Sequence, residues 1–312
     1  MHIDKYSPSS KHTIKMFPAV FLVTFLIAVS MLVVQPEQPK QVQAAQSSQL
    51  HHFIGGFSVE DAISSASSLG IGAALDSGYN PVPSDSRSKA LKAANIAIID
   101  NMPEEYLRQF GSDGNMTNLV NSMTAHLKAE QNNAQIVAYW LIDDWSQNGS
   151  AKAALQQMTS LIHHYTPGKP SICGFNGDVT PNNGIIWVDG KADNFSPQGC
   201  DMVAPYIYGH TADPLDWTMS KVLPAIENSL KARGWHIASN PLVGIAQSFG
   251  GTSDFALPTA SDVETQTKSY CQAGALGIIY YDFDTGQNAS NNSGIRQGIK
   301  AGIADCKAIW GK

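Results

Sequence analysis

The chain has 312 residues, of which 43% are hydrophobic and 15% are charged, and its formal net charge is -6. This is the composition of a globular protein with a large core, and it excludes disordered, collagen-like and multi-spanning membrane chains. With 20 Lys and Arg residues against 26 Asp and Glu residues, the chain lacks the basic surface that neutralises phosphates. We therefore expect no nucleic-acid partner.

The N-terminal segment, residues 1–44, has the pattern of an export signal. Three lysines precede an uncharged apolar run over Met16–Val34, and Val42–Ala44 then has the small-residue spacing that signal peptidases accept. Cleavage is expected after Ala44, and residues 45–52 form a short linker. Because about 20 apolar residues span a bilayer, an uncleaved membrane anchor is the alternative. Both interpretations predict a secreted or extracytoplasmic protein that meets the membrane only through this segment.

From residue 51 onward, short apolar runs alternate with stretches whose apolar residues recur every three or four positions. This alternation is typical of parallel β/α units. Strands are expected at Phe53–Phe57, Ile71–Asp76, Asn95–Asp100, Ile136–Asp143, Ser171–Phe175, Met202–Tyr208, Leu242–Gln247 and Gly277–Phe283. Eight such strands predict a single α/β domain over 53–312, a (β/α)8 TIM barrel, a fold of about 250 residues.

Seven helices are expected between these strands. They are Val59–Ser68, Ser84–Ala93, Asn115–Glu130, Ala151–Tyr165, Trp217–Arg233, Ala260–Ala273 and Ser293–Trp310. The connection over Gly177–Gln198 is expected to be mostly loop. A doubly wound open sheet is the alternative fold, but the GxGxxG phosphate turn of that fold is missing after the first strand.

The motifs of several cofactor and metal enzymes are missing. The sequence has no GxxxxGK[ST] loop, no HExxH and no GxSxG, and its four cysteines have no CxxC spacing. We expect neither a cofactor nor a metal. Disulfides fit an exported chain. The expected pairs are Cys271–Cys306 between the last two helices and Cys173–Cys200 at adjacent strands. The alternative is that the four cysteines are small buried hydrophobic residues.

Polar and aromatic residues collect at the expected carboxyl ends of the strands, where TIM barrels carry their chemistry. Sugar hydroxyls take carboxylates and amides as partners, and sugar rings stack on aromatic faces. A phosphate ligand would need basic groups, which this rim almost lacks. The sequence predicts a carbohydrate partner bound by Asp100, Asp143, Trp145, Asn176, Asp178, Tyr206, Tyr208, Gln247 and Tyr281.

Glycoside hydrolysis uses two carboxyl groups that flank the scissile bond. Asp144 is the candidate proton donor, because burial beside Trp140 and Trp145 favours its protonated form. Asp143 would stay ionised and orient a sugar hydroxyl. The alternative is that both aspartates cap the helix that follows.

The candidate partners of Asp144 stand at the end of the eighth strand. Asp282 and Asp284 share strand parity, so both can face the barrel mouth. The alternative is a structural pair that binds loop amides.

Five segments between Gln135 and Thr285 resemble strand motifs of glycoside-hydrolase-like TIM barrels related to the large retaining-glycosidase clan. They are Tyr139–Trp145, Ile162–Pro170, Cys200–Tyr208, Ala246–Gly251 and Ala273–Tyr281. The resemblance implies a hydrolase of glycosidic bonds in a poly- or oligosaccharide.

Two positions depart from that clan. Its acid/base glutamate is replaced by the shorter Asp144, and its glutamate nucleophile is replaced by Gln247, which cannot form the usual glycosyl ester. An inverting or substrate-assisted hydrolase and a non-catalytic carbohydrate-binding barrel both remain open. A metal-dependent hydrolase is disfavoured because histidine is nearly absent at the strand ends; its ligands would be Asp100, Asp143, Asp178 and Asp284.

Overall fold

The computed structural model describes residues 51–59, 62–75, 81, 83–143, 151–180, 184–187, 199–209, 211, 215–232, 234–283, 289 and 291–311. At 151, 176–180, 184–187, 216 and 217 it describes the backbone alone. All these residues belong to one compact unit. The expected export segment over 1–44 lies outside them and stays a prediction. Within the described ranges, no helix combines the length and the apolar character needed to cross a bilayer.

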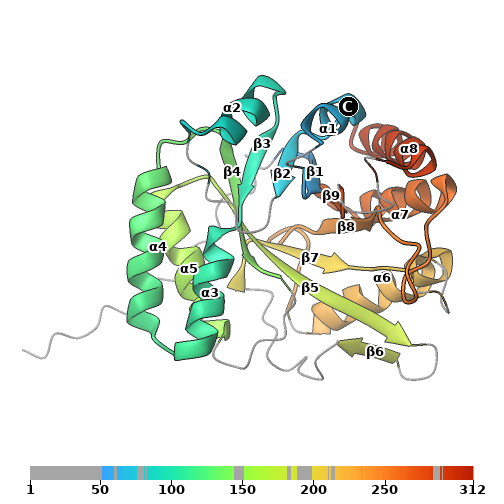
Figure 1. Ribbon diagram of the computed structural model, residues 1–312. Helices are drawn as coiled ribbons and strands as arrows, with labels where there is room; N and C mark the ends of the chain where they lie inside the picture. The colour runs from blue at the N-terminus through green and yellow to red at the C-terminus, as the bar shows by residue number, and fades with distance from the viewer. Residues whose placement is uncertain are drawn as a thin grey trace, which may run out of the picture. The chain divides into compact units, whose positions relative to one another are not determined.

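Eight parallel strands form a closed barrel, which confirms the predicted fold class (Figure 1). The ring closes because the first and last strands pair with each other. In chain order the strands are β1 (Phe53–Phe57), β2 (Ala73–Leu75), β3 (Ala97–Asp100), β4 (Ile136–Ile142), β5 (Ser171–Thr180), β7 (Met202–Tyr206), β8 (Val243–Gln247) and β9 (Gly277–Tyr281).

Helices surround this barrel, and all seven expected helices are present. The structure has α1 (Ile63–Leu69), α2 (Ser86–Ala93), α3 (Met102–Asp113), α4 (Met116–Glu130), α5 (Ala151–Tyr165), α6 (Leu215–Ala232), α7 (Ala260–Gln272) and α8 (Ser293–Ile309).

Helix α3 was not expected from the sequence, although its ends carry recognisable signals. Pro103 and two glutamates stand in its first turn, and Gly114 ends it with a φ of 63°. The sequence prediction allowed one helix between β3 and β4, and the structure has two.

The connection after β5 also differs from the prediction. It contains a further strand, β6 (Gly184–Trp187), which pairs antiparallel with the extended end of β5. The expected loop over Gly177–Gln198 is therefore in part a hairpin.

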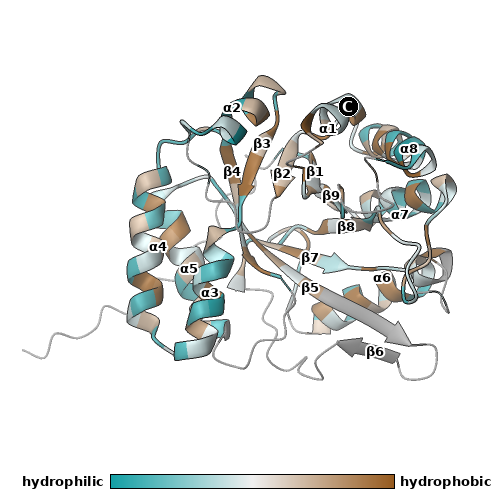
Figure 2. Cartoon of the chain, viewed as in Figure 1, coloured by the Kyte–Doolittle hydropathy of each residue, from teal (hydrophilic) through white to brown (hydrophobic). Residues whose placement is uncertain are grey.

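The strands lie between two buried layers, so they appear in the sequence as apolar runs rather than as alternating patterns. Side chains such as Ile99, Trp140 and Ile245 fill the barrel, whereas Ile98, Leu141 and others pack under the helices. In Figure 2, β3 and β4 are largely apolar, while α3, α4 and α8 alternate apolar and polar residues. This is the pattern of helices with one face on a sheet.

Both expected disulfides are present. Cys271 in α7 is bonded to Cys306 in α8, with their Cα atoms 5.5 Å apart. Cys173 in β5 is bonded to Cys200, which precedes β7, with their Cα atoms 6.0 Å apart. One crosslink therefore fastens the last two helices, and the other fastens two neighbouring strands.

A cavity of about 410 Å³ opens at the amino-terminal end of the barrel. Its lining includes Phe53, Ala73, Ala97 and Ile136, which start four neighbouring strands. In TIM barrels this end serves stability, and the chemistry lies at the opposite end. The residues expected to bind sugar belong to that opposite end.

Candidate functional site

A hydrogen-bonded pair stands at the carboxyl ends of β4 and β7. The hydroxyl of Tyr206 donates to Oδ1 of Asp143. The register between β4 and β5 shifts after Trp140, so one extra residue enters β4 and both Leu141 and Ile142 pack under the helices. This irregularity brings Asp143 into contact with Tyr206, whose ring belongs to the barrel interior.

Gly174 of β5 provides the space in which this pair meets Trp140. A Cβ atom at Gly174 would clash with the Tyr206 hydroxyl and with Cζ2 and Cη2 of Trp140. The rings of Trp140 and Tyr206 stack with their centroids 6.3 Å apart and an interplanar angle of 23°. The bare backbone of β5 thus allows the side chains from β4 and β7 to approach each other.

Further aromatic rings continue from Tyr206 around the mouth. Tyr208 lies 6.0 Å from Tyr206 at an interplanar angle of 8°, and Tyr281 lies 5.8 Å from Tyr208 at 22°. Phe249 contacts Tyr208 edge-on at 5.1 Å. We call Trp140, Tyr206, Tyr208 and Tyr281 the aromatic row. Tyr208 and Tyr281 are partly exposed, so their surfaces can stack against a sugar ring.

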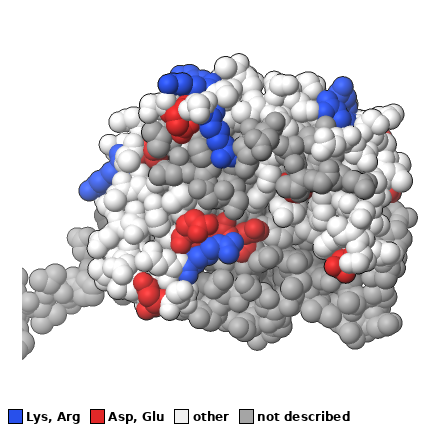
Figure 3. All heavy atoms as spheres, viewed as in Figure 1, with Lys and Arg blue, Asp and Glu red and all other residues white. Residues whose placement is uncertain are grey.

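Among the described residues of the face drawn in Figure 3, acidic and basic side chains form small groups between uncharged ones. One ion pair joins Arg108 to Glu104 in α3, at 2.5 Å between Nη2 and Oε1. Burial raises the pKa of the Glu104 carboxyl, although Arg108 and the backbone N–H of Asp143 oppose that rise. The Glu104 carboxyl therefore accepts a hydrogen bond from the backbone of Asp143 and helps to position that residue.

Gln247 lies beneath the mouth and does not open into it. Its side chain is buried, with Oε1 accepting from the N–H of Gly209 at 2.7 Å. Its Nε2 donates to the carbonyls of Phe249 at 3.0 Å and Ala256 at 3.2 Å. The amide thus joins the segments that follow β7 and β8, and we leave Gln247 out of the ligand-binding set.

Asp100 faces the helix layer and not the mouth. Its Oδ2 lies 2.6 Å from Nε2 of His126 in α4, and its Oδ1 accepts from the N–H of Met102 at 3.0 Å. Burial lowers the pKa of His126, but the hydrogen bond and charge of Asp100, together with the charge of Glu130, outweigh burial and raise it. Asp100 therefore connects α3 and α4 to the barrel through these contacts, and its expected contact with substrate stays a prediction.

The carboxylates expected from β9 are only partly within the described residues. Asp282 is 7% exposed, and its backbone carbonyl accepts from the hydroxyl of Ser248 at 3.0 Å. Asp144, Trp145 and Asp284 lie outside the described residues, as do the side chains of Asn176 and Asp178. Their roles stay predictions.

The metal hypothesis has little support in the described part of the chain. No group of three His, Cys, Asp or Glu residues there could hold a metal ion. Of its four proposed ligands, only Asp100 and Asp143 have described side chains, and Asp100 is bound to His126 under the helices.

Two residues of the barrel interior were not predicted as binding residues. Asn101 follows β3 directly, and Trp140 stands opposite it in β4. The amide of Asn101 and the indole nitrogen of Trp140 are buried without a hydrogen-bond partner. The sequence could have predicted that both side chains face inward, because each lies two residues after an inward-facing residue, Ile99 or Ala138, and side chains alternate along a strand.

Comparison with known proteins agrees with this fold. No family model and no curated protein matches the chain. Among solved structures, an endo-β-1,4-mannanase from Thermotoga petrophila is 11% identical, with 83% of this chain and 77% of that chain covered and a TM-score of 0.57. A GH18 chitinase from Pseudoalteromonas aurantia is 14% identical, with 81% and 99% covered and a TM-score of 0.54.

A β-1,4-D-mannanase from Cryptopygus antarcticus is also similar, at 12% identity and a TM-score of 0.52, with 80% of this chain and 90% of that chain covered. At such identities the likeness is one of fold. The closed ring of eight parallel strands and these structural neighbours together show that the chain has a glycoside-hydrolase-like TIM-barrel fold.

Proposed function

We propose that this protein is an exported glycoside hydrolase that acts on glycosidic bonds of a poly- or oligosaccharide. The observation that carries the proposal is the partly exposed Asp143 carboxylate, hydrogen-bonded to Tyr206 at the carboxyl end of the barrel and next to the aromatic row. A carboxylate beside stacked rings can bind a hydroxyl while the ring of the same sugar packs on an aromatic face.

In the proposed reaction, Asp144 protonates the leaving oxygen as the bond from that oxygen to the anomeric carbon breaks. Asp282 or Asp284 accepts a proton from the water that attacks the anomeric carbon. Asp143, held by Tyr206, orients a neighbouring hydroxyl. Because Gln247 cannot act as a nucleophile, we favour direct attack by water with inversion, for which the two carboxyl groups stand about 6.5–9.5 Å apart.

A non-catalytic carbohydrate-binding barrel is the second candidate. It is favoured by the contacts of Gln247, because the position of the clan's nucleophile is occupied by an amide that joins two loops. Binding through the aromatic row does not require a nucleophile.

Product release from defined glycans tests the proposal. Mannohexaose, chitohexaose and their polymers are incubated with the full chain, and products are separated by chromatography and identified by mass spectrometry. We expect hydrolysis of at least one glycan, and a loss of about 10²–10⁴-fold in rate on Asp144→Asn, the usual contribution of a general acid.

The matched control is Asp305→Asn in α8, which removes only a surface ion pair with Lys268 at 3.0 Å and should leave the rate unchanged. Binding without product from the wild type would establish the second candidate. If the wild type neither binds nor cleaves any of these glycans, both candidates are contradicted.

We also propose that the chain is exported through its N-terminal segment. The N-terminus of the secreted protein should then be Ala45, as read by N-terminal sequencing. A membrane-bound protein that keeps Met16–Val34 would instead establish the uncleaved anchor.

A further inference from the structure

Two polar groups inside the barrel lack hydrogen-bond partners although they are almost fully buried. Both Oδ1 and Nδ2 of Asn101 are without a partner, and so is Nε1 of Trp140. Asn101 is 1% exposed and Trp140 is 0% exposed. Buried polar groups are nearly always paired, so an unpaired set of this kind calls for an explanation.

The register of the sheet places the two residues side by side. Ile99 pairs with Ala138 and Asp100 pairs with Tyr139, so Asn101, the residue directly after β3, comes level with Trp140 of β4. Ile99, Ala138 and Trp140 belong to the cluster that fills the barrel. Strand alternation therefore turns Asn101 to the same interior.

The unpaired groups also stand close to the Asp143–Tyr206 pair. The six-membered ring of Trp140 and the hydroxyl of Tyr206 approach the same point above Gly174. Nε1 of Trp140 is two bonds from Cζ2, one of the ring atoms at this point, so the indole nitrogen lies close to it as well. Asn101, Trp140 and Tyr206 thus form one polar and aromatic floor beneath Asp143.

The chemistry of this floor selects a neutral ligand. The Asn101 amide offers one acceptor oxygen beside two donor hydrogens, and Trp140 adds a third donor. An anion would meet the Asn101 oxygen and the nearby Asp143 carboxylate, and Arg108, a basic side chain whose charge reaches Asp143, is already paired with Glu104. Two neighbouring hydroxyls of a sugar ring, or the N–H and C=O of an N-acetyl group, present the matching donor and acceptors.

We propose that Asn101 and Trp140 bind two adjacent polar groups of one sugar ring at this floor, next to Asp143. The inference rests on the proposed function, since it assigns the direct hydrogen-bond donors and acceptor of the same sugar site. In the free protein these groups are unpaired and closed to solvent, so a sugar reaches them as the groups above them give way. The polar contacts then form away from water, where they are strongest.

Asn101→Leu and Trp140→Phe test the proposal. Both remove the polar group, but only leucine keeps the size of the original side chain, because phenylalanine leaves a cavity where the buried indole stood. We expect the affinity for sugar to fall by about tenfold or more in both variants. The free protein should keep or gain stability in Asn101→Leu, because an unpaired buried group is lost, and should lose stability in Trp140→Phe. Affinity is measured by calorimetry with mannohexaose and chitohexaose, and stability by urea unfolding. The oligosaccharide whose affinity falls distinguishes hydroxyls from N-acetyl groups.

Trp235→Phe is the matched control, because Nε1 of Trp235 already donates to the carbonyl of Asn240 at 2.8 Å. This variant should lose stability and keep its affinity for sugar. If the wild type binds sugar and both floor variants keep its affinity, the inference is wrong and the proposed function stands. If the wild type binds neither oligosaccharide, the proposed function fails and the inference with it.

Discussion

Gln247 stands where the resembling clan has its nucleophile, and its side chain makes structural hydrogen bonds instead. Its amide nitrogen donates to two backbone carbonyls after β8, and its oxygen accepts from a backbone N–H after β7. A glutamate would keep the acceptor and lose both donations. Its carboxylate would then face the carbonyls of Phe249 and Ala256 at close range.

We therefore expect Gln247→Glu to lower the free energy of unfolding by about 1–3 kcal/mol, without creating a retaining hydrolase. Urea unfolding at pH 7 measures the change. The control is Gln157→Glu, which changes an exposed residue of α5 and should have little effect. A variant as stable as the wild type would contradict the structural role of Gln247.

Gly174 is the second residue on which the site depends. Its missing side chain leaves room for Trp140 and for the Tyr206 hydroxyl. We expect Gly174→Ala to cost about 1–3 kcal/mol of stability by overpacking, and to weaken sugar binding because Tyr206 and Asp143 must separate. Calorimetry with the oligosaccharide that the wild type binds, together with urea unfolding, checks both effects.

Gly72→Ala is the control for this substitution. The nearest atom to a Cβ at Gly72 is the carbonyl oxygen of Ile54 at 3.8 Å, which is an ordinary contact. If Gly174→Ala behaved like Gly72→Ala, the tight approach over β5 would have no bearing on the site.

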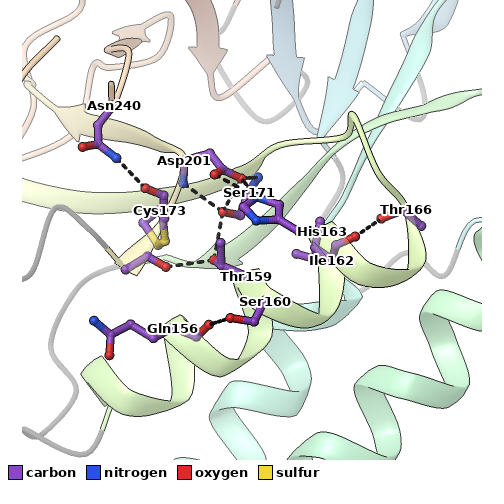
Figure 4. Close-up of polar contacts among 12 residues, drawn as sticks. Gln156, Thr159, Ser160, Ile162, His163, Thr166, Ser171, Cys173, Asp201 and Asn240 are labelled. Carbon is purple, nitrogen blue, oxygen red and sulfur yellow. Dashed lines mark hydrogen bonds and ion pairs between the residues drawn. A yellow bond between two sulfur atoms is a disulfide. The ribbon is translucent and has the colours of Figure 1, made fainter. Parts of the chain in front are cut away.

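At the scale of elements, one polar cluster fastens α5 to two strands at the amino-terminal end of the barrel (Figure 4). Nε2 of His163 lies 2.9 Å from both carboxylate oxygens of Asp201. The N–H and hydroxyl of Ser171, the first residue of β5, donate to the same carboxylate at 2.8 Å and 3.0 Å. Asp201 therefore joins a helix, the start of β5 and the start of β7.

This cluster predicts a pH dependence of stability. The hydrogen bond to Asp201 raises the pKa of His163, although burial opposes it. The stabilisation is therefore fully present below the unfolded pKa of about 6.5 and is lost as pH rises through the higher folded pKa. His163→Gln should reduce the fall in the free energy of unfolding above pH 6.5, as measured by urea titrations at a series of pH values.

Some pH dependence should remain in that variant, because Asp100 raises the pKa of buried His126 as well. His164→Gln changes the exposed neighbour in α5 and serves as the control. An unchanged slope in His163→Gln would show that this contact contributes nothing to the pH response.

The elements of the fold were largely predictable, because the strands are buried on both faces and the helices carry an apolar stripe. Helix α3 was missed because α4 begins two residues beyond Gly114, so that two helices occupy one connection. The hairpin of β6 was missed because its pairing partner is the far end of β5.

The site was predictable only where position along a strand decides the outcome. Tyr206 and Asp143 were predicted to lie at the mouth because Tyr206 ends β7 and Asp143 directly follows β4. The contacts of Gln247 could not be foreseen, since its partners are backbone groups of the two segments that follow β7 and β8. The orientation of Asp100 could be predicted, because side chains alternate along a strand and Asp100 follows the inward-facing Ile99. Its partner His126 could not be predicted, because the strand pattern does not tell where α4 lies.

At the scale of the whole molecule, the sequence separates an apolar N-terminal segment from a barrel domain with the glycoside-hydrolase-like fold. The composition is acidic, but the described part of the barrel mouth is mainly aromatic. The described carboxylates Asp100 and Glu104 act as supports, and Asp143 is the described carboxylate that contacts the aromatic row. This distribution of the described side chains supports the proposed sugar ligand.

The pairing of β1 with β9 sets an order on folding. Strand β1 can pair with β2 soon after both are synthesised, but its other edge stays open until almost the whole chain exists. His52 then stacks on Trp310 with ring centroids 4.4 Å apart, beside the seam. A chain that ends before β9 would expose the edges of β1 and β8, and open strand edges promote aggregation. Incomplete copies of this protein are therefore expected to accumulate as aggregates and not as smaller folded barrels.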